Sequence, residues 1–118
     1  MAGKYVTYYD VTPWTCAVEV MLAKSSVGQN GSYLLQVFDS GGTVRATRTK
    51  NLTLFQTDRV NINNLIEEQG ATGIAREGLL MISDAGSDDD EFVSVLKIVG
   101  RGQEPNVGMR YIPFTRIE

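Results

Sequence analysis

The sequence has no histidine, a single cysteine and only three prolines among its 118 residues. Without histidine, the most common general base and the usual zinc or copper ligand are missing, which excludes the Ser-His-Asp and Cys-His nucleophile systems. A lone cysteine cannot form an intrachain disulfide, and Cys16 stands in an apolar segment that predicts a buried thiol rather than a nucleophile. We therefore predict a protein that is not an enzyme and that holds no metal ion and no other cofactor.

Long apolar runs and a basic excess are absent too. No run of roughly eighteen apolar residues occurs, so the sequence predicts no membrane insertion. The formal net charge is −3, unlike the strongly basic balance of nucleic-acid-binding proteins, and no nucleic-acid partner is expected. The first residues lack the apolar core of a signal peptide, so we expect a cytoplasmic protein; a secreted chain whose leader had been removed would look the same.

What the sequence does contain is a series of short alternating or apolar segments. They recur about every eight to twelve residues between clusters of Gly, Asn, Asp and Ser, which is typical of antiparallel β-sandwiches and barrels. The length is that of one domain, and the 42% hydrophobic content is that of a globular one. We therefore predict an all-β fold: a single antiparallel β-sandwich of about seven to eight strands with one short helical turn, forming one domain over residues 1–118.

The segment Tyr33–Ile66 reads as three strands joined by turns. Its first turn, Asp39–Gly42, contains Asp, Ser and two Gly residues, which favour a tight hairpin connection. The strand after this turn alternates, which predicts Val44 and Ala46 on one face.

One short helical turn is predicted where this segment ends. Asn63 or Asn64 can accept a hydrogen bond from the first turn of a helix, and Gly70 can adopt the conformation that ends one. No other segment favours a helix, so we expect this turn to be the main break in the series of strands.

Two segments are apolar at both alternating sets of positions. They are Trp14–Ala23 and the continuous apolar run Gly78–Asp84. In Trp14–Ala23, Glu19 is the only polar side chain that follows the first two residues. This pattern predicts a central strand that is buried on both faces or covered by a partner. The final strand contains Pro113, which lacks a backbone N–H and therefore predicts an edge strand or a bulge.

Charged residues are unevenly placed along the chain. Residues 1–60 hold six Lys and Arg against four Asp and Glu, whereas residues 61–118 hold five against ten. The acidic segment Asp84–Glu91 offers the oxygen ligands that Ca²⁺ prefers but lacks the spacing of an EF-hand, so we expect a solvated loop, with calcium binding as the alternative. If the protein self-assembles, we expect the basic residues around the hairpin to meet this loop of a neighbouring copy. The residues concerned are Arg45, Arg48, Lys50 and Arg59 on the basic side and Asp88, Asp89 and Asp90 on the acidic side.

Aromatic residues gather near the two ends of the chain. A core position is the expected role for most of them, but an exposed aromatic patch would bind a protein partner or a sugar. Trp14 and Tyr111 are the candidates for such a surface. The other members of the group are Tyr5, Tyr8, Tyr9 and Phe114.

The order of these segments resembles that of a known family. The segment YLLQVFDSGGTVRATRTKNLTL resembles its strand, Asp-Gly turn and strand, and VNINNLI resembles the capped segment that follows; GLLMISDAG with FVSVLKIVG, and MRYIPFTRI, resemble its later strands. Over about residues 17–117 the sequence is similar to the sandwich family of the cyanobacterial sensory rhodopsin transducer and its uncharacterised bacterial relatives. The resemblance implies a small, soluble, non-enzymatic β-sandwich that self-associates and acts through protein contacts. It does not extend to the rhodopsin partnership, because no receptor-binding motif is recognisable.

Two classes of function are compatible with these features. The first is a non-catalytic protein–protein interaction or assembly module that forms homo-oligomers and contacts an unknown protein; the two-faced apolar strands and the split charge favour it. The second is a carbohydrate-binding or structural β-sandwich on a cell surface or a virion, which the aromatic residues and the acidic loop favour.

Overall fold

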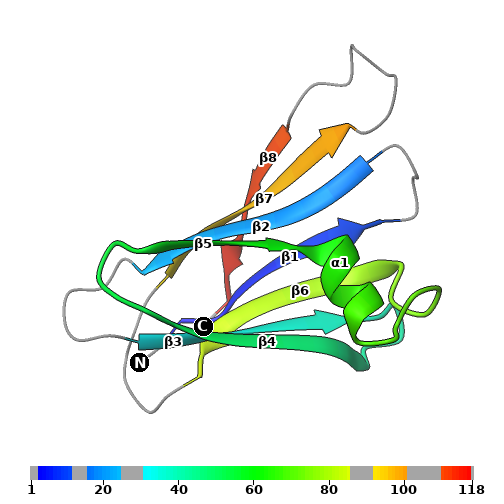
Figure 1. Ribbon diagram of the computed structural model, residues 1–118, viewed down its shortest axis with the longest axis horizontal. Coiled ribbons are helices and arrows are strands. Elements are labelled where there is room, and N and C mark those ends of the chain that lie inside the picture. The colour runs from blue at the N-terminus through cyan, green and yellow to red at the C-terminus, as the bar shows by residue number, and fades with distance from the viewer. Residues whose placement is uncertain (1–2, 12–15, 25–30, 86–91, 101–109, 118) are drawn as a thin grey trace.

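The chain folds into two antiparallel sheets. The computed structural model describes residues 3–11, 16–24, 31–85, 92–100 and 110–117. These residues form nine strands and one helix. The strands make up a five-stranded sheet of order β4-β3-β6-β1-β9 and a four-stranded sheet of order β5-β2-β7-β8 (Figure 1). The two sheets pack as a sandwich, so the predicted all-β fold with a short helix is confirmed. The elements are β1 (Tyr5–Asp10), β2 (Cys16–Lys24), β3 (Gly31–Phe38), β4 (Val44–Leu52), β5 (Thr57–Asn61), α1 (Ile62–Glu68), β6 (Glu77–Asp84), β7 (Phe92–Gly100), β8 (Arg110–Pro113) and β9 (Thr115–Arg116).

The inner faces of both sheets supply the core through simple alternation. In β3, Tyr33, Leu35 and Val37 are buried, while the residues between them are half-buried. The rings of Tyr33 and Phe92, one from each sheet, meet edge to face with their centroids 6.2 Å apart. Since burying one large apolar side chain contributes about 1.5 to 3 kcal/mol, this interdigitated layer is what holds the sheets together.

The last predicted strand is divided between the two sheets. Strand β8 pairs with β7 at one edge of the four-stranded sheet, and β9 pairs with β1 at one edge of the five-stranded sheet. The chain crosses at Phe114, whose N–H donates a 3.3 Å hydrogen bond to the carbonyl of Ser94. The edge position predicted from Pro113 is confirmed, and the division explains why nine strands are described where seven to eight were expected.

A β-bulge changes the alternation at the start of β4. Val37 pairs with Ala46. The next pair along β3 joins Phe38 to Val44, so Arg45 is the extra residue of the bulge. Ala46 is buried, but Val44 is 39% exposed on the opposite side of the sheet. The prediction that these two residues share a face is therefore wrong, because one inserted residue reverses the side to which the preceding residue points.

Helix α1 begins two or three residues earlier than predicted. The side chain of Asn61, rather than Asn63 or Asn64, caps it by accepting a 2.9 Å hydrogen bond from the N–H of Asn64. This start places apolar residues at the first, fourth and fifth helical positions on the buried side. Gly70 follows the helix with a φ of 71°, which confirms its predicted role in ending it. The buried helical residues are Ile62, Leu65 and Ile66.

The two strands that were predicted to be central, and to be buried on both faces or covered by a partner, lie in different sheets. Both β2 and β6 are internal strands, as expected for central positions. In β6, however, Leu80 and Ile82 are buried, whereas Leu79 is 39% exposed and Met81 is half-buried. Burial on both faces is therefore wrong for β6, because none of the described residues forms a second layer over its outer side.

Candidate interaction surfaces

The basic residues around the β3–β4 hairpin are paired with carboxylates of the same chain. Arg45 Nε lies 2.7 Å from Asp39 Oδ2. The other oxygen of Asp39 accepts hydrogen bonds from the backbone N–H groups of Gly41 and Thr43. The Arg45 guanidinium, together with these backbone donors, holds the pKa of the Asp39 carboxyl below its ordinary value. Arg45 therefore belongs to the hydrogen-bonded structure of the hairpin turn.

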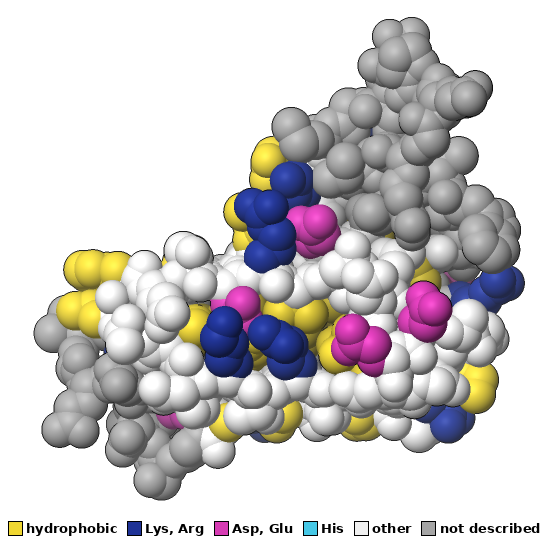
Figure 2. Space-filling model, in the orientation of Figure 1, with side chains coloured by type: hydrophobic (Ala, Val, Ile, Leu, Met, Phe, Trp, Pro, Cys, Tyr) yellow, Lys and Arg dark blue, Asp and Glu magenta, His cyan; other side chains and the backbone are white. Residues whose placement is uncertain are grey.

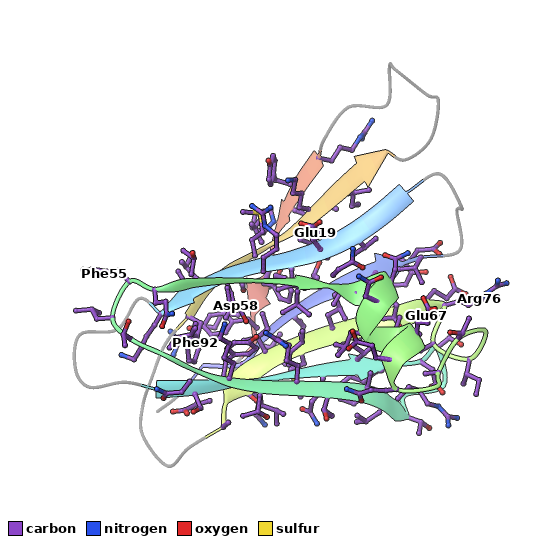
Figure 3. The ribbon with its side chains drawn as sticks, viewed as in Figure 1. Glu19, Phe55, Asp58, Glu67, Arg76 and Phe92 are labelled. Carbon is purple, nitrogen blue, oxygen red and sulfur yellow. The ribbon has the colours of Figure 1, made fainter. Side chains whose placement is uncertain are left out.

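Arg48 and Lys50 bridge the two sheets instead of pointing outward. Asp58, on β5 of the other sheet, lies 3.1 Å from Arg48 Nη2 and 3.4 Å from Lys50 Nζ. The buried Tyr33 hydroxyl donates a hydrogen bond to Asp58 Oδ2 and accepts one of 2.9 Å from Arg48 Nε. Figure 3 shows Asp58 in the space between β5 and β4, where these groups link the edges of the two sheets.

The chemistry of this bridge fixes its protonation state near neutral pH. Burial alone raises the pKa of the Asp58 carboxyl, but the donors around it, led by the Tyr33 hydroxyl, outweigh burial and hold the pKa below its ordinary value. Burial and the hydrogen bond to Asp58 raise the pKa of the Tyr33 hydroxyl. Asp58 is therefore ionised and Tyr33 protonated at pH 7, and the bridge serves as an internal link between the sheets.

Arg59 lies on the outer side of β5, away from the bridge. Its Nε is 3.6 Å from Glu19 Oε2 on the neighbouring strand β2. That distance is an ion pair but not a hydrogen bond, and Glu19 Oε2 is buried with no hydrogen-bond partner among the described residues. Arg59 is also directly opposite Met21 in the strand register, so a charged and an apolar side chain stand next to each other here.

The predicted basic surface is therefore three separate places rather than one. From Ala46 onward, every second residue of β4 faces inward, and this turns Arg48 and Lys50 toward the other sheet. Figure 2 shows basic and acidic side chains interspersed on this side of the molecule. The acidic residues that were expected to meet the basic ones in a neighbouring copy, Asp88–Asp90, lie outside the described residues, so that pairing stays a prediction.

The described aromatic residues near the chain ends do not form one patch either. Tyr9 is buried, and its hydroxyl donates to the carbonyls of Phe38 and Ala75, at 3.1 and 3.0 Å. Burial raises the pKa of this hydroxyl to about 12. Tyr111 is 53% exposed on β8, in the sheet that does not contain β1. Trp14 lies outside the described residues.

The outer side of the five-stranded sheet, which we call face A, is a surface that sequence reasoning missed. Met81 lies at its centre, in register with Gln36 on one side and Val6 on the other. Leu79 and Tyr8, the next outward pair, are 39% and 59% exposed. Its charged outward residues, Asp10 and Glu77, pair with each other at one end of the face, whereas the outward side chains of its central rows are uncharged. They are Val6, Tyr8, Leu34, Gln36, Phe38, Val44, Thr47, Thr49, Leu79, Met81, Ser83 and Thr115.

The signal for face A was present in the sequence but depended on the pairing of distant strands. The outward set in each of β1, β3 and β6 lacks Lys, Arg, Asp and Glu between its ends. Each set alone resembles an ordinary half-buried strand. Only the register, which joins Leu34 to Ser83 and Met81 to Val6, turns them into one continuous surface.

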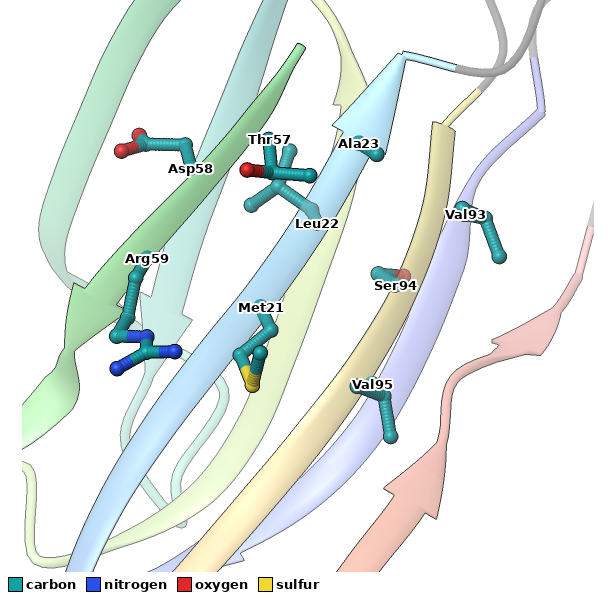
Figure 4. Close-up of a pocket in the computed structure, with 9 residues that line it drawn as sticks. All are labelled: Met21, Leu22, Ala23, Thr57, Asp58, Arg59, Val93, Ser94 and Val95. Carbon is teal, nitrogen blue, oxygen red and sulfur yellow. The ribbon is translucent and has the colours of Figure 1, made fainter. Parts of the chain in front are cut away.

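The outer side of the four-stranded sheet, which we call face B, combines apolar and charged side chains. Val93 is 62% exposed, and Met21 and Val95 are half-buried beside it. A hollow of about 460 Å³ lies over β5, β2 and β7 (Figure 4). Face B consists of Glu19, Met21, Ala23, Thr57, Arg59, Val93, Val95, Lys97 and Tyr111.

A smaller hollow of about 370 Å³ lies at the end of face A, beside the β3–β4 turn. Tyr8 lines it, and its hydroxyl donates a 2.7 Å hydrogen bond to Glu77 Oε2. This hydrogen bond, with some burial, raises the pKa of the Tyr8 hydroxyl. An exposed aromatic ring next to carboxylates in a shallow hollow is a surface on which a sugar can stack and form hydrogen bonds.

The fold and its surfaces define a class: a two-sheet antiparallel β-sandwich with exposed apolar side chains on both outer faces. Among the described residues, no three His, Cys, Asp or Glu side chains are grouped in a way that could hold a metal ion. The helix in that part of the chain does not have the length and apolar character needed to span a bilayer. Comparisons with protein-family models, with curated proteins and with solved structures found no match. The resemblance to the transducer family therefore stays a prediction.

Proposed function

We propose that this protein is a non-catalytic β-sandwich interaction module that assembles into homo-oligomers and presents the assembly to a protein partner. The observation that carries the proposal is the set of outward apolar side chains on the internal strands β6 and β2, with Leu79 and Met81 on one side of the sandwich and Met21 on the other. An antiparallel sheet with one face in water normally alternates apolar and polar residues. An apolar outer set is typical of a surface that another molecule covers.

Two further features support the non-catalytic part of the proposal. The sequence has no histidine. The carboxylates with the most perturbed surroundings, Asp39 and Asp58, are held by arginine and by backbone or tyrosine donors within the chain. A carboxylate engaged in this way is a poor general base, because its lowered pKa reduces its affinity for a proton.

The resemblance to the transducer family and the single cysteine support a cytoplasmic location and self-association by protein contact. A thiol that cannot form an intrachain disulfide is typical of a reducing compartment. Fractionation of the source cells with an antibody against the chain tests the location, and recovery in the culture medium or in an envelope fraction would contradict it.

Sedimentation equilibrium tests the homo-oligomeric part. We expect the weight-average mass to rise above the 13.0 kDa of one chain as concentration increases from about 1 µM to about 500 µM. A single 13.0 kDa species over the whole range would rule out self-assembly. Because the measurement needs no partner, the result does not depend on identifying one.

Carbohydrate binding, on a cell surface or a virion, is the second candidate function. The hollow at the end of face A favours it, because Tyr8 is 59% exposed there beside Glu77. A glycan array and saturation-transfer NMR test it, with Tyr8→Ala as the variant that removes the ring and Tyr111→Ala, an exposed tyrosine on the other sheet, as the matched control. Binding that survives Tyr8→Ala, or a silent array, would count against a sugar site at this position.

A further inference from the structure

We propose that face A of one copy packs against face A of a second copy around a two-fold axis that passes close to Met81. This inference rests on the proposed self-assembly and adds which surface is used, with which occupant and in which symmetry. Face B is left free in this arrangement for the other partner of the module.

The composition of face A matches the centre of a protein–protein interface. Its middle row runs Gln36, Met81, Val6 and Thr115 across four strands in hydrogen-bonded register. Interface centres are depleted in charged residues and enriched in aromatic residues and methionine. The charged residues of these strands stand only at their ends, as Asp10 and Glu77 do on β1 and β6.

Charge also identifies the occupant. An uncharged surface centre gains nothing from packing against charged side chains, so the surface that complements it best also has an uncharged centre. Face B does not meet this requirement, because packing it on face A would bury Glu19, Arg59 and Lys97 against apolar side chains. Pairing of face A with face B would also be heterologous, which gives rings or open chains of molecules rather than a closed dimer. The second copy therefore presents face A, and the pair closes as a dimer.

The available area agrees with a reversible dimer. Five strands at a spacing of about 4.8 Å make face A roughly 24 Å wide, and the eight-residue strands β3 and β6 make it roughly 26 Å long. With side-chain relief, two such faces bury on the order of 1,200 Å², at the low end of the range for specific interfaces. We therefore expect a dissociation constant in the micromolar range, roughly 1 to 100 µM.

The test introduces one charge at the centre of each outer face. Met81→Lys places it on face A, and Met21→Lys is the matched control on face B, since both methionines are half-buried, outward-directed and on internal strands. We expect Met81→Lys to raise the dimer dissociation constant at least about tenfold and Met21→Lys to change it less than about twofold. Gln36→Glu, which adds a charge with almost no change of shape, is expected to act as Met81→Lys does.

A rescue experiment separates loss of contact from loss of fold. In a two-fold dimer centred near Met81, the variant Met81→Lys of one copy meets Met81→Glu of the other. Each variant alone should remain monomeric in sedimentation velocity, and an equimolar mixture should recover the dimer. A mixture that stays monomeric while circular dichroism shows both variants folded would overturn the two-fold arrangement.

The outcomes distinguish this inference from the proposed function. A wild-type protein that is monomeric at every concentration overturns both. A wild-type oligomer that Met21→Lys dissociates, alone or together with Met81→Lys, overturns the assignment to face A and leaves self-assembly standing. An oligomer that Met81→Lys and Gln36→Glu dissociate, that Met21→Lys preserves and that the mixed charge pair restores supports the inference.

Discussion

Face A and face B cover opposite sides of one core but differ in the number of charged side chains that they expose. Face B carries Glu19, Arg59 and Lys97 among its apolar residues and is hollowed by about 460 Å³. Face A has no charged side chain across its central rows. Both faces consist of the outward positions of strands whose inward positions are buried in the same way, so the fold requires neither composition. In the proposed dimer, this difference separates the face that a second copy covers from the face that stays in water.

The largest loss of folding stability is expected for a substitution where face A ends against the β3–β4 turn. Gly78, with a φ of 153°, lies so close to this turn that an added Cβ would overlap the carbonyl oxygen of Phe38 and lie 2.9 Å from the carbonyl carbon of Asp39. Gly78→Ala should lower the free energy of unfolding by at least about 3 kcal/mol, because backbone must move on one side or the other. Urea denaturation measures it.

Gly41→Ala is the matched control for this prediction. Gly41 lies in the same turn, but an added Cβ would make only an ordinary contact of 3.4 Å with Asp39 Oδ1. We expect a change below about 0.5 kcal/mol. If both substitutions had the same effect, close packing of the turn on β6 would not be what positions the end of face A.

The next largest effect concerns the bridge that holds the two sheets together. Asp58→Ala removes the acceptor of Tyr33 and Arg48 and should cost about 2 kcal/mol of unfolding free energy, since the buried tyrosine hydroxyl is left with no acceptor for its proton. Lys50→Ala removes only an exposed ion pair and should cost less than about 0.5 kcal/mol. Similar losses from both variants would show that the buried hydrogen bonds do not stabilise the bridge.

The same bridge gives a pH dependence with a definite sign. The pKa of Asp58 is lower in the folded chain than its ordinary value, so its ionised form stabilises the fold above the ordinary value of about 3.9. This contribution is lost as the pH falls through the folded pKa. The difference in stability between wild type and Asp58→Ala should therefore be smaller at a pH of about 3 than at about 7. A difference that grows in acid would contradict the assignment.

A smaller effect is expected on face B. Arg59→Gln removes an exposed cation that lies 3.6 Å from Glu19, and we expect unfolding free energy to change by no more than about 0.5 kcal/mol. Self-association should not change either, because face B is outside the proposed dimer. An Arg59→Gln protein that dissociates would instead place charge pairs of face B in the contact between copies and would break the contrast between the faces.

The smallest expected effect is that of salt on the dimer. An interface without charges has nothing for salt to screen, so raising sodium chloride from about 0.05 M to about 0.5 M should change the dissociation constant less than about twofold. Sedimentation velocity at both concentrations measures this. An increase of tenfold or more would favour charge pairing between copies, such as the predicted contact between Arg45 and the acidic loop.

Local pattern was enough to predict the strands but not their neighbours. The strand and turn pattern at the start of Tyr33–Ile66 correctly predicted a β-hairpin, and the proline at position 113 correctly predicted an edge strand. The bulge at Arg45 could not be predicted, because a bulge depends on how two strands are matched rather than on either strand alone.

The candidate surfaces were harder to predict than the fold for the same reason. Arg48 and Lys50 were grouped with Arg45 by their nearness in sequence, but their role depends on Asp58 in the other sheet. Face A is made from strands that are far apart along the chain, so no single segment displays it. Its absence of charge becomes visible only when the register of those strands is known.

The position of β9 has a consequence for how the protein is made. Tyr5 is in register with Arg116, so the first strand acquires its last neighbour only when the end of the sheet-forming sequence is available. During synthesis, β1 must wait for β6 before it can join the sheet, and its other edge stays unpaired until β9 follows. Completion of this sheet edge therefore depends on long-range pairing, and a ribosome-bound chain arrested before residue 110 should lack it.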